Sequence, residues 1–234
     1  MTRKTLNIAS TPDNRARRRF EARQKRKDPG GKRKTERDNL ILLLVAVCLV
    51  GVNVAVAAYL GISLASARSR TRALKDLGFL RCWVLSADRP NYLTLTKKGR
   101  AAVARFTGED PASYPLLTRL PRQLEHVLAI GRVYVALQVG AARLNRLKLD
   151  LALDWQLKAE LGGNRAGVQV PDFVAALTGP TGTRHSYIGE LDRGTSSVNV
   201  VLAKARAYAA LKRTGRTVRG LSLIHISEPT RRPI

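Results

Sequence analysis

The run NLILLLVAVCLVGVNVAVAAYLGIS, residues 39–63, decides how the rest of the chain is interpreted. From Leu40 to Leu60 it holds 21 residues without a charge, which is long enough to span a bilayer, and a basic segment precedes it as in a cytoplasmic anchor. Gly51 and Asn53, however, stand at its middle and favour a break between two short helices. We therefore expect two packed helices, and a membrane anchor over Leu40–Leu60 remains the alternative.

A third helix is predicted directly after this run, with Ser63 as its N-cap. Apolar or small residues recur there at helical spacing and define one buried face: Leu64, Ala67, Thr71, Leu74 and Leu77. The other faces carry Ser66, Arg68, Ser69, Arg70 and Arg72. Gly78 ends this helix. Its exposed side is thus expected to be polar and basic.

Two strands and a fourth helix complete this region. LRCWVL (80–85) and YLTLT (92–96) are typical of strands, and SADRPN (86–91) joins them. Thr96 then caps a helix over 97–106. Residues 39–106 therefore predict a winged helix-turn-helix, with Arg68, Arg70 and Arg72 on its recognition helix and Arg81 and Arg89 on its wing.

The charge of the chain agrees with a polyanionic partner. Among 234 residues, 42 Lys and Arg stand against 17 Asp and Glu, a formal net charge of +25, which favours double-stranded DNA. A basic protein from a GC-rich genome is the alternative. Residues 1–38 hold a net +9 with almost nothing apolar, so we predict a disordered basic arm that follows phosphates, or else a solubilising leader.

The cysteines and histidines indicate neither disulfides nor a metal cage. Cys48 and Cys82 have no disulfide or zinc spacing, which is typical of a reducing cytoplasm. The three histidines are scattered, and His126 on a helix is more often a packed residue than a ligand.

The second half predicts an α/β domain. Residues 107–121 have the Pro and Gly pattern of a linker, and residues 122–145 that of an amphipathic helix. Strands are expected within 149–161, 168–179 and 184–195, with a turn at 178–183. Residues 196–215 return to helical spacing, with these candidate packing positions: Val198, Val201, Leu202, Ala205, Tyr208 and Leu211.

Acidic residues are scarce in this half and fall at strand positions. Asp172 follows Pro171, and Glu190 and Asp192 flank Leu191 at the end of the next strand, so pairing of the strands would let the three converge. Glu160 is positioned to join them. Such oxygen ligands suit Mg²⁺ or Mn²⁺ and phosphodiester hydrolysis. The alternatives are that they pair with Arg165, Arg184 or Arg193, or that the domain is a metal-free scaffold.

WQLKAEL, VPDFVAAL and GELDRGTSSVNVVLAKARAYAAL, downstream of a winged helix, resemble the replication-relaxation family of plasmid and integrative-element proteins. The resemblance covers roughly residues 39–215, and its most specific part is ELDRGT (190–195) together with Lys204 and Tyr208. It implies a DNA-binding protein that helps to replicate, relax or mobilise an element in a bacterial cytoplasm.

The PD motif followed by E-x-D more distantly resembles the PD-(D/E)xK nuclease fold, which has a central mixed sheet. This resemblance implies that Asp172 and Glu190 hold the metal and that Glu160 is an extra acid. Asp192 stands where that fold has its lysine, a departure that Lys204 on the next helix would compensate.

The end of the chain differs in composition from everything before it. LSLIHISEPTR (221–231) resembles a translated sequencing adapter, and a docking peptide is the alternative. We therefore expect residues 221–234 to be artefactual and residues 122–220 to be a C-terminally truncated domain that lacks a strand. Without the tail, the net charge falls only to +24.

These observations together predict an α+β protein: a winged helix-turn-helix followed by a truncated, PD-(D/E)xK-like α/β domain with a small central sheet. The expected role is that of a cytoplasmic, DNA-binding accessory factor, with a Mg²⁺-dependent nuclease or nickase as the first alternative and a membrane-anchored protein as the second. A homodimer and replication or relaxase partners remain open.

Overall fold

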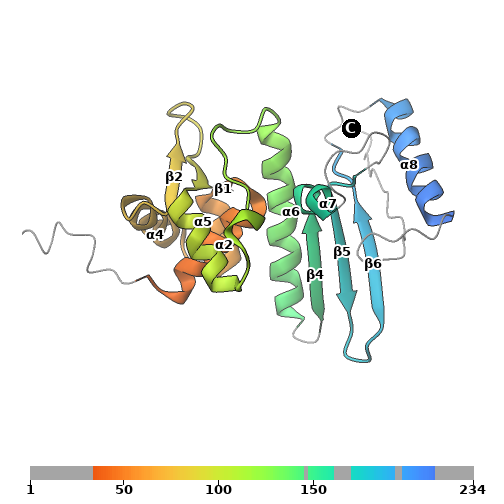
Figure 1. Ribbon diagram of the computed structural model, residues 1–234, viewed down its shortest axis with the longest axis horizontal. Coiled ribbons are helices and arrows are strands. Elements are labelled where there is room, and N and C mark those ends of the chain that lie inside the picture. Colours follow the sequence, from red (N-terminus) through yellow and green to blue (C-terminus); the bar gives the residue numbers. More distant parts are fainter. Residues whose placement is uncertain (1–33, 145–146, 161–169, 193–196, 214–234) are drawn as a thin grey trace, which may run out of the picture.

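The computed structural model describes residues 34–144, 147–160, 170–192 and 197–213. Figure 1 shows a helical unit that contains a small sheet at one end of the molecule, named here the first unit. A larger sheet with its helices, named here the second unit, lies at the other end, and the long helix α6 lies between the two. The α+β class is confirmed. The predicted basic arm over 1–33 and the predicted tail over 221–234 lie outside these ranges.

The apolar run is divided at the predicted place. It forms α2 (Glu36–Cys48), β1 (Gly51–Val52) and α3 (Asn53–Leu60). Leu49 ends α2 with a φ of 62°, a conformation that a helix cannot continue. A Cβ on Gly51 would lie 2.8 Å from Val45 Cγ2, so the close approach of β1 to α2 requires glycine. No helix in the described ranges is long and apolar enough to cross a membrane.

Helix α2 begins earlier than the predicted boundary at residue 39. Residues 36–38, assigned above to the basic arm, form its first turn. The backbone N–H of Thr35 donates to Asp38 Oδ2 (2.9 Å), which caps the helix at this point.

The first unit continues with α4 (Leu64–Asp76), β2 (Leu80–Trp83), β3 (Tyr92–Leu95) and α5 (Lys97–Thr107). The three short strands form an antiparallel sheet in the order β1-β3-β2, with Leu80 opposite Leu95 and Trp83 opposite Tyr92. Ser63 and Thr96 cap α4 and α5 as predicted, each accepting a backbone N–H at 3.1 Å. The strands and helices predicted for 63–106 are therefore confirmed.

The predicted buried face of α4 is largely correct. Ala67, Thr71 and Leu74 are buried, whereas Leu64 and Leu77 are only half-buried. Ala67 and Leu74 pack with α2, β2 and α3 in one hydrophobic core, which also includes Ile41, Leu42, Val45, Val56 and Val103.

Residues 107–121 are largely exposed, but one side chain of this segment packs on the first unit. They include the short 3₁₀-helix η2 (Pro111–Ser113), and Tyr114 is buried in the core of the first unit. The Tyr114 hydroxyl donates to Thr107 Oγ1 (3.0 Å). A large aromatic ring thus reaches back onto α5 and attaches part of the predicted linker to the first unit.

The second half comprises α6 (Leu124–Arg143), β4 (Lys148–Leu153), α7 (Asp154–Glu160), β5 (Phe173–Thr178), β6 (Arg184–Gly189) and α8 (Val198–Arg213). Its described strands form an antiparallel sheet in the order β4-β5-β6. The strand predicted within 149–161 is correct only as far as Leu153, because Asp154 begins a helix whose Leu157 is buried. The mixed sheet of the nuclease resemblance is not seen, since these three strands are antiparallel.

Helix α6 joins the two halves. Its buried residues Ile130, Tyr134 and Val135 belong to the same core as α2, although the predicted boundary placed this helix in a separate domain. Trp155 of α7 adds a hydrogen bond from Nε1 to the carbonyl oxygen of Val47 (2.8 Å). The two predicted domains thus share a core across α6.

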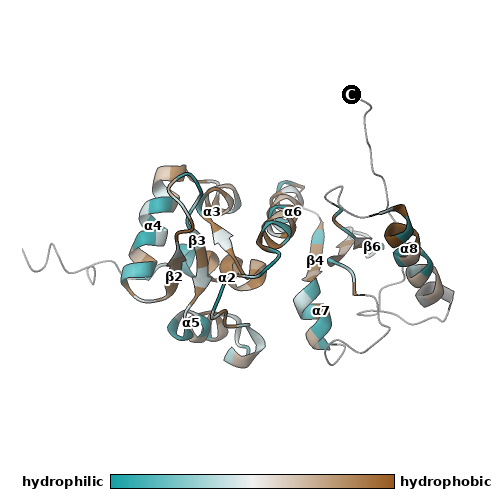
Figure 2. Cartoon of the chain, turned by 90° about the horizontal axis from the view of Figure 1, so that it is seen from above, coloured by the Kyte–Doolittle hydropathy of each residue, from teal (hydrophilic) through white to brown (hydrophobic). Residues whose placement is uncertain are grey.

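Helix α8 is packed through fewer positions than predicted. Tyr208 is buried, but Val198, Val201 and Leu202 are 73%, 43% and 47% exposed. Figure 2 shows strongly hydrophobic positions on α8 at the outer end of the molecule. The predicted packing role of these three residues is wrong, because the helix contacts the sheet through its Tyr208 side.

Candidate functional site

Helix α4 presents the polar face that the sequence predicts. Ser66, Arg68, Ser69 and Arg72 are all exposed. Hydrophilic positions recur along this helix, which lies at the outer edge of the first unit (Figure 2). The Ser63 hydroxyl donates to Ser66 Oγ (2.9 Å) at its first turn. The face therefore offers hydroxyl and guanidinium donors to a ligand.

Arg70 occupies a different place from its neighbours. Its Nε donates to Asp38 Oδ1 (2.9 Å), its Nη2 donates to Asp38 Oδ2, and the same Nη2 lies 3.3 Å from Thr35 Oγ1. The Asp38 side chain is only 3% exposed. This pair links α4 to the start of α2, so Arg70 orients the helix while the other arginines face outward.

The loop between β2 and β3, residues 84–91 and named here the hairpin loop, contains Arg89, and Arg81 lies on the strand before it. Arg81 on β2 is exposed, and its guanidinium lies 5.3 Å from the ring of Trp83. The Trp83 indole donates to the buried Thr94 Oγ1 (2.9 Å), which fixes the ring. Arg89 is half-exposed and lies 3.7 Å from Glu125, a separation at which a surface pair is weak.

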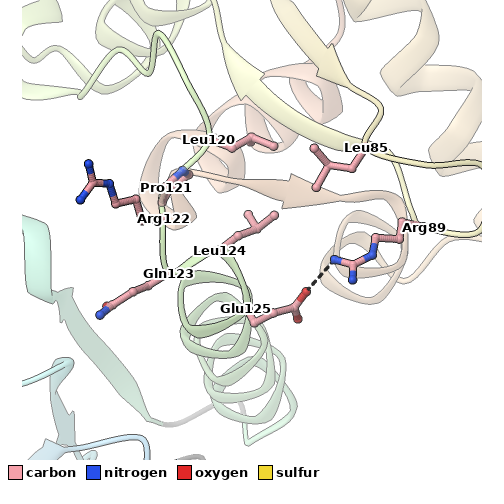
Figure 3. A pocket seen from close by; sticks show the side chains of 8 residues that line it. All are labelled: Leu85, Arg89, Leu120, Pro121, Arg122, Gln123, Leu124 and Glu125. Atoms are coloured by element: carbon pink, nitrogen blue, oxygen red, sulfur yellow. Dashed lines mark ion pairs between the residues drawn. The ribbon is translucent and has the colours of Figure 1, made fainter.

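A pocket of about 430 Å³ lies between the hairpin loop and the start of α6. Figure 3 shows Leu85 and Arg89 on one side and the segment Leu120–Glu125 on the other, with the Arg89–Glu125 pair across it. The hairpin loop thus faces the start of α6 across this pocket, an arrangement that sequence patterns did not predict.

The carboxylate of Asp172 is held by two partners. His126 Nε2 lies 3.0 Å from Asp172 Oδ1, and the backbone N–H of Leu191 donates to Asp172 Oδ2 (2.7 Å). Asp172 precedes β5 rather than lying mid-strand, which corrects the prediction. Asp172 connects α6 to the end of the sheet through these two hydrogen bonds. No spacing pattern in the sequence related Asp172 to His126.

The carboxylate of Glu190 is directed to α8. Lys204 Nζ donates to Glu190 Oε2 (2.5 Å), and the Tyr208 hydroxyl donates to Oε1. Three of the residues that carry the most specific part of the family resemblance, Glu190, Lys204 and Tyr208, are therefore brought together, and residues 193–195 lie outside the described ranges. Lys204 does reach the carboxylate end of the sheet, as the nuclease resemblance required.

The predicted convergence of carboxylates is not observed. Phe173 pairs with Gly189, so Asp172 and Glu190 flank one end of the β5–β6 ladder. Their side chains nevertheless bond to different helices, α6 and α8. Asp192 and Glu160 are exposed, and Asp192 lies beyond β6, where strand alternation does not orient it.

Among the residues that the structure describes, no group of three or more His, Cys, Asp and Glu side chains is placed to hold a metal. Each of Asp172 and Glu190 already accepts two hydrogen bonds. The donor set therefore does not fit the Mg²⁺ site implied by the nuclease resemblance. Of the arginines offered as alternative partners, Arg184 lies 3.3 Å from Asp150, and Arg165 and Arg193 lie outside the described residues.

Two comparisons with known proteins bear on this arrangement. A search of curated proteins found no match. A model of the replication-relaxation family matches residues 55–223, which includes most of α3, all of α4, the hairpin loop, both helices that bond the carboxylates and the whole second sheet. The chain belongs to the replication-relaxation family.

Proposed function

We propose that the chain is a duplex-DNA-binding protein that serves the replication, relaxation or mobilisation of a plasmid or other mobile element. Its first unit would act as a winged helix, with α4 as the recognition helix and the hairpin loop as the wing. One observation carries the proposal: the order α2-β1-α3-α4-β2-β3, with the strands paired as β1-β3-β2 and an exposed Ser/Arg face on α4.

The chemistry of that face suits a nucleic acid. Arg68 and Arg72 offer planar donor forks that bind phosphate oxygens or the acceptor edge of guanine, and Ser66 and Ser69 offer hydroxyls. Arg81, stacked on Trp83, is positioned to contact a phosphate beside the hairpin loop. The net charge of +25 would supply a sequence-independent attraction that weakens with salt.

For the second unit we propose a scaffolding role rather than metal-dependent hydrolysis. Asp172 and Glu190 bond to α6 and α8, so they hold helices against the sheet. Because α6 is also part of the core of the first unit, this arrangement would fix the position of the second sheet relative to the DNA-binding face.

Fluorescence anisotropy with a labelled duplex of a few helical turns tests the proposal. The unmodified chain should bind with an affinity that falls steeply with NaCl, and R68A/R72A should weaken binding and lower the magnitude of the salt slope by up to about 2. K158A, which removes one positive charge away from α4, is the control, because Lys158 lies on α7 and pairs with Asp154 (2.8 Å). Equal binding by R68A/R72A and the unmodified chain would refute the assignment of α4.

A supercoiled plasmid incubated with Mg²⁺ separates binding from hydrolysis. The scaffold proposal expects no nicking by the unmodified chain. Nicking that is lost in D172A would show that the second unit is an enzyme.

A further inference from the structure

A second basic surface surrounds the ring of Phe79, where α4 ends and β2 begins. Lys34 Nζ lies 5.5 Å and Lys98 Nζ 4.7 Å from the centroid of this ring. Arg105, on the same helix as Lys98, is near enough for its charge to act on Lys34. The pKa of Lys34 is lowered first by partial burial and then by Arg105, while Asp38 raises it. All three cationic side chains are exposed.

The acidic neighbour does not neutralise this cluster. The Asp38 carboxylate is already bound by Arg70 through both of its oxygens and is almost wholly buried. Among the residues that the structure describes, the three cations therefore share one surface without an ion pair to a carboxylate. Like charges repel one another, so an anion that binds between the three cations lowers the electrostatic free energy of this surface.

Local structural roles explain only part of the arrangement. Lys98 Nζ donates to the carbonyl oxygen of Leu77 (2.9 Å), which caps the C-terminal end of α4. Each lysine also gains a cation–π contact with Phe79. Neither role requires Lys34, Lys98 and Arg105 to gather on one side of the molecule.

The position of this cluster relative to the hairpin loop suits a duplex. The β2–β3 ladder runs from the Leu80–Leu95 pair, beside Phe79, to the Trp83–Tyr92 pair, beside the hairpin loop. Four residues of strand span about 10 Å, and the DNA major groove is about 12 Å wide with a backbone on each side. In Figure 1 the hairpin loop and the start of α2 lie at opposite ends of the first unit.

We propose that Lys34, Lys98 and Arg105 form a phosphate-binding surface for the DNA backbone on the side of the groove opposite the hairpin loop. This inference rests on the proposed function, because it assumes that α4 enters the groove between the two surfaces. The ligand is the phosphodiester backbone, so the contact contributes affinity and orientation and carries no base specificity.

The test is the salt dependence of duplex binding by the full chain. K34A/K98A should lower the magnitude of the slope of log K against log salt by about 2, and K34R/K98R should keep it. K158A should leave the slope unchanged. Thermal unfolding of each variant shows whether it is folded. If loss of the Lys98 cap unfolds the double variant, K34A and R105A take its place, each with an expected decrease of about 1.

The outcomes separate this inference from the proposed function. No duplex binding by the unmodified chain would overturn both. Binding that is weakened in R68A/R72A but has an unchanged slope in K34A/K98A would overturn the second surface alone. Calorimetry with inorganic phosphate adds a further arm. Saturable phosphate binding that is lost in K34A/K98A, together with an unchanged DNA slope, would indicate a free-phosphate site and contradict the backbone contact.

Discussion

Arg70 in α4 binds the buried carboxylate of Asp38 in α2 through two nitrogens, one of them at 2.9 Å. The residue lies among exposed arginines on the same helix, yet it connects two helices of the core. A charged side chain on a largely exposed helix can therefore stabilise the fold. Substitution of Arg70 tests stability, whereas substitution of its exposed neighbours tests ligand binding.

Substitution of Arg70 should destabilise the fold far more than substitution of Arg68. R70A leaves the Asp38 carboxylate buried without its guanidinium partner and with the Thr35 N–H still donating to it, which should cost about 3 kcal/mol of unfolding free energy. R68A removes an exposed side chain and should change that free energy by less than about 0.5 kcal/mol. Urea unfolding measures both, and equal stability of the two variants would contradict the structural role of Arg70.

Two glycine substitutions in helices should act in opposite directions. A Cβ on Gly99 would lie 2.1 Å from the carbonyl oxygen of Phe79, so G99A should destabilise the chain by about 3 kcal/mol or more. Gly140 in α6 has no atom within 4 Å of an added Cβ. G140A should therefore stabilise the chain by up to about 1 kcal/mol through helix propensity. Thermal unfolding distinguishes the signs, and a stable G99A would refute this packing.

The buried Tyr114 should make stability fall at high pH. Burial raises the pKa of its phenol from 10.0 to about 12. Because the folded pKa lies above the unfolded one, this contribution is fully present below pH 10 and is lost as the pH rises through about 12. The loss of unfolding free energy across this window should be smaller in Y114F. An identical pH profile for the two proteins would show that Tyr114 ionises equally in both states.

Glu190 should hold α8 against the sheet. Because several apolar residues of α8 are exposed, its bonds from Lys204 and Tyr208 to Glu190 matter more than they would in a well-packed helix. Loss of these bonds should cost about 1.5 kcal/mol locally, so E190A should increase hydrogen exchange of α8 amides roughly tenfold. Amides of α6 should be unaffected, and E125A at the surface is the control. Unchanged protection of α8 in E190A would contradict this role.

Much of the first unit was predictable from sequence because local signals agree with one another. Gly51 and Asn53 divide the apolar run, Ser63 and Thr96 cap their helices, and two β-rich segments form the hairpin. The role of Arg70 was not predictable, because helical periodicity places it on a polar face of α4 and its partner is 32 residues away.

The second unit was less predictable because its contacts are non-local. The alternation of apolar and polar residues continues past Leu153, but the next segment is a helix that buries Leu157. The few carboxylates of this unit led to the prediction of a shared metal site, and strand pairing does bring Asp172 and Glu190 to one end of the sheet. Helices α6 and α8 then supply His126, Lys204 and Tyr208 as partners, which neither spacing nor composition can position.

Photocrosslinking from the outer face of α4 tests the central claim most directly. A benzophenone side chain is introduced at the exposed Ser69, and a matched one at the exposed Ala209 on α8. With a labelled duplex, the account predicts a protein–DNA adduct from position 69, diminished by R68A/R72A, and none from position 209. Adducts from position 209 alone, or none from position 69 under conditions where the duplex is bound, would contradict it.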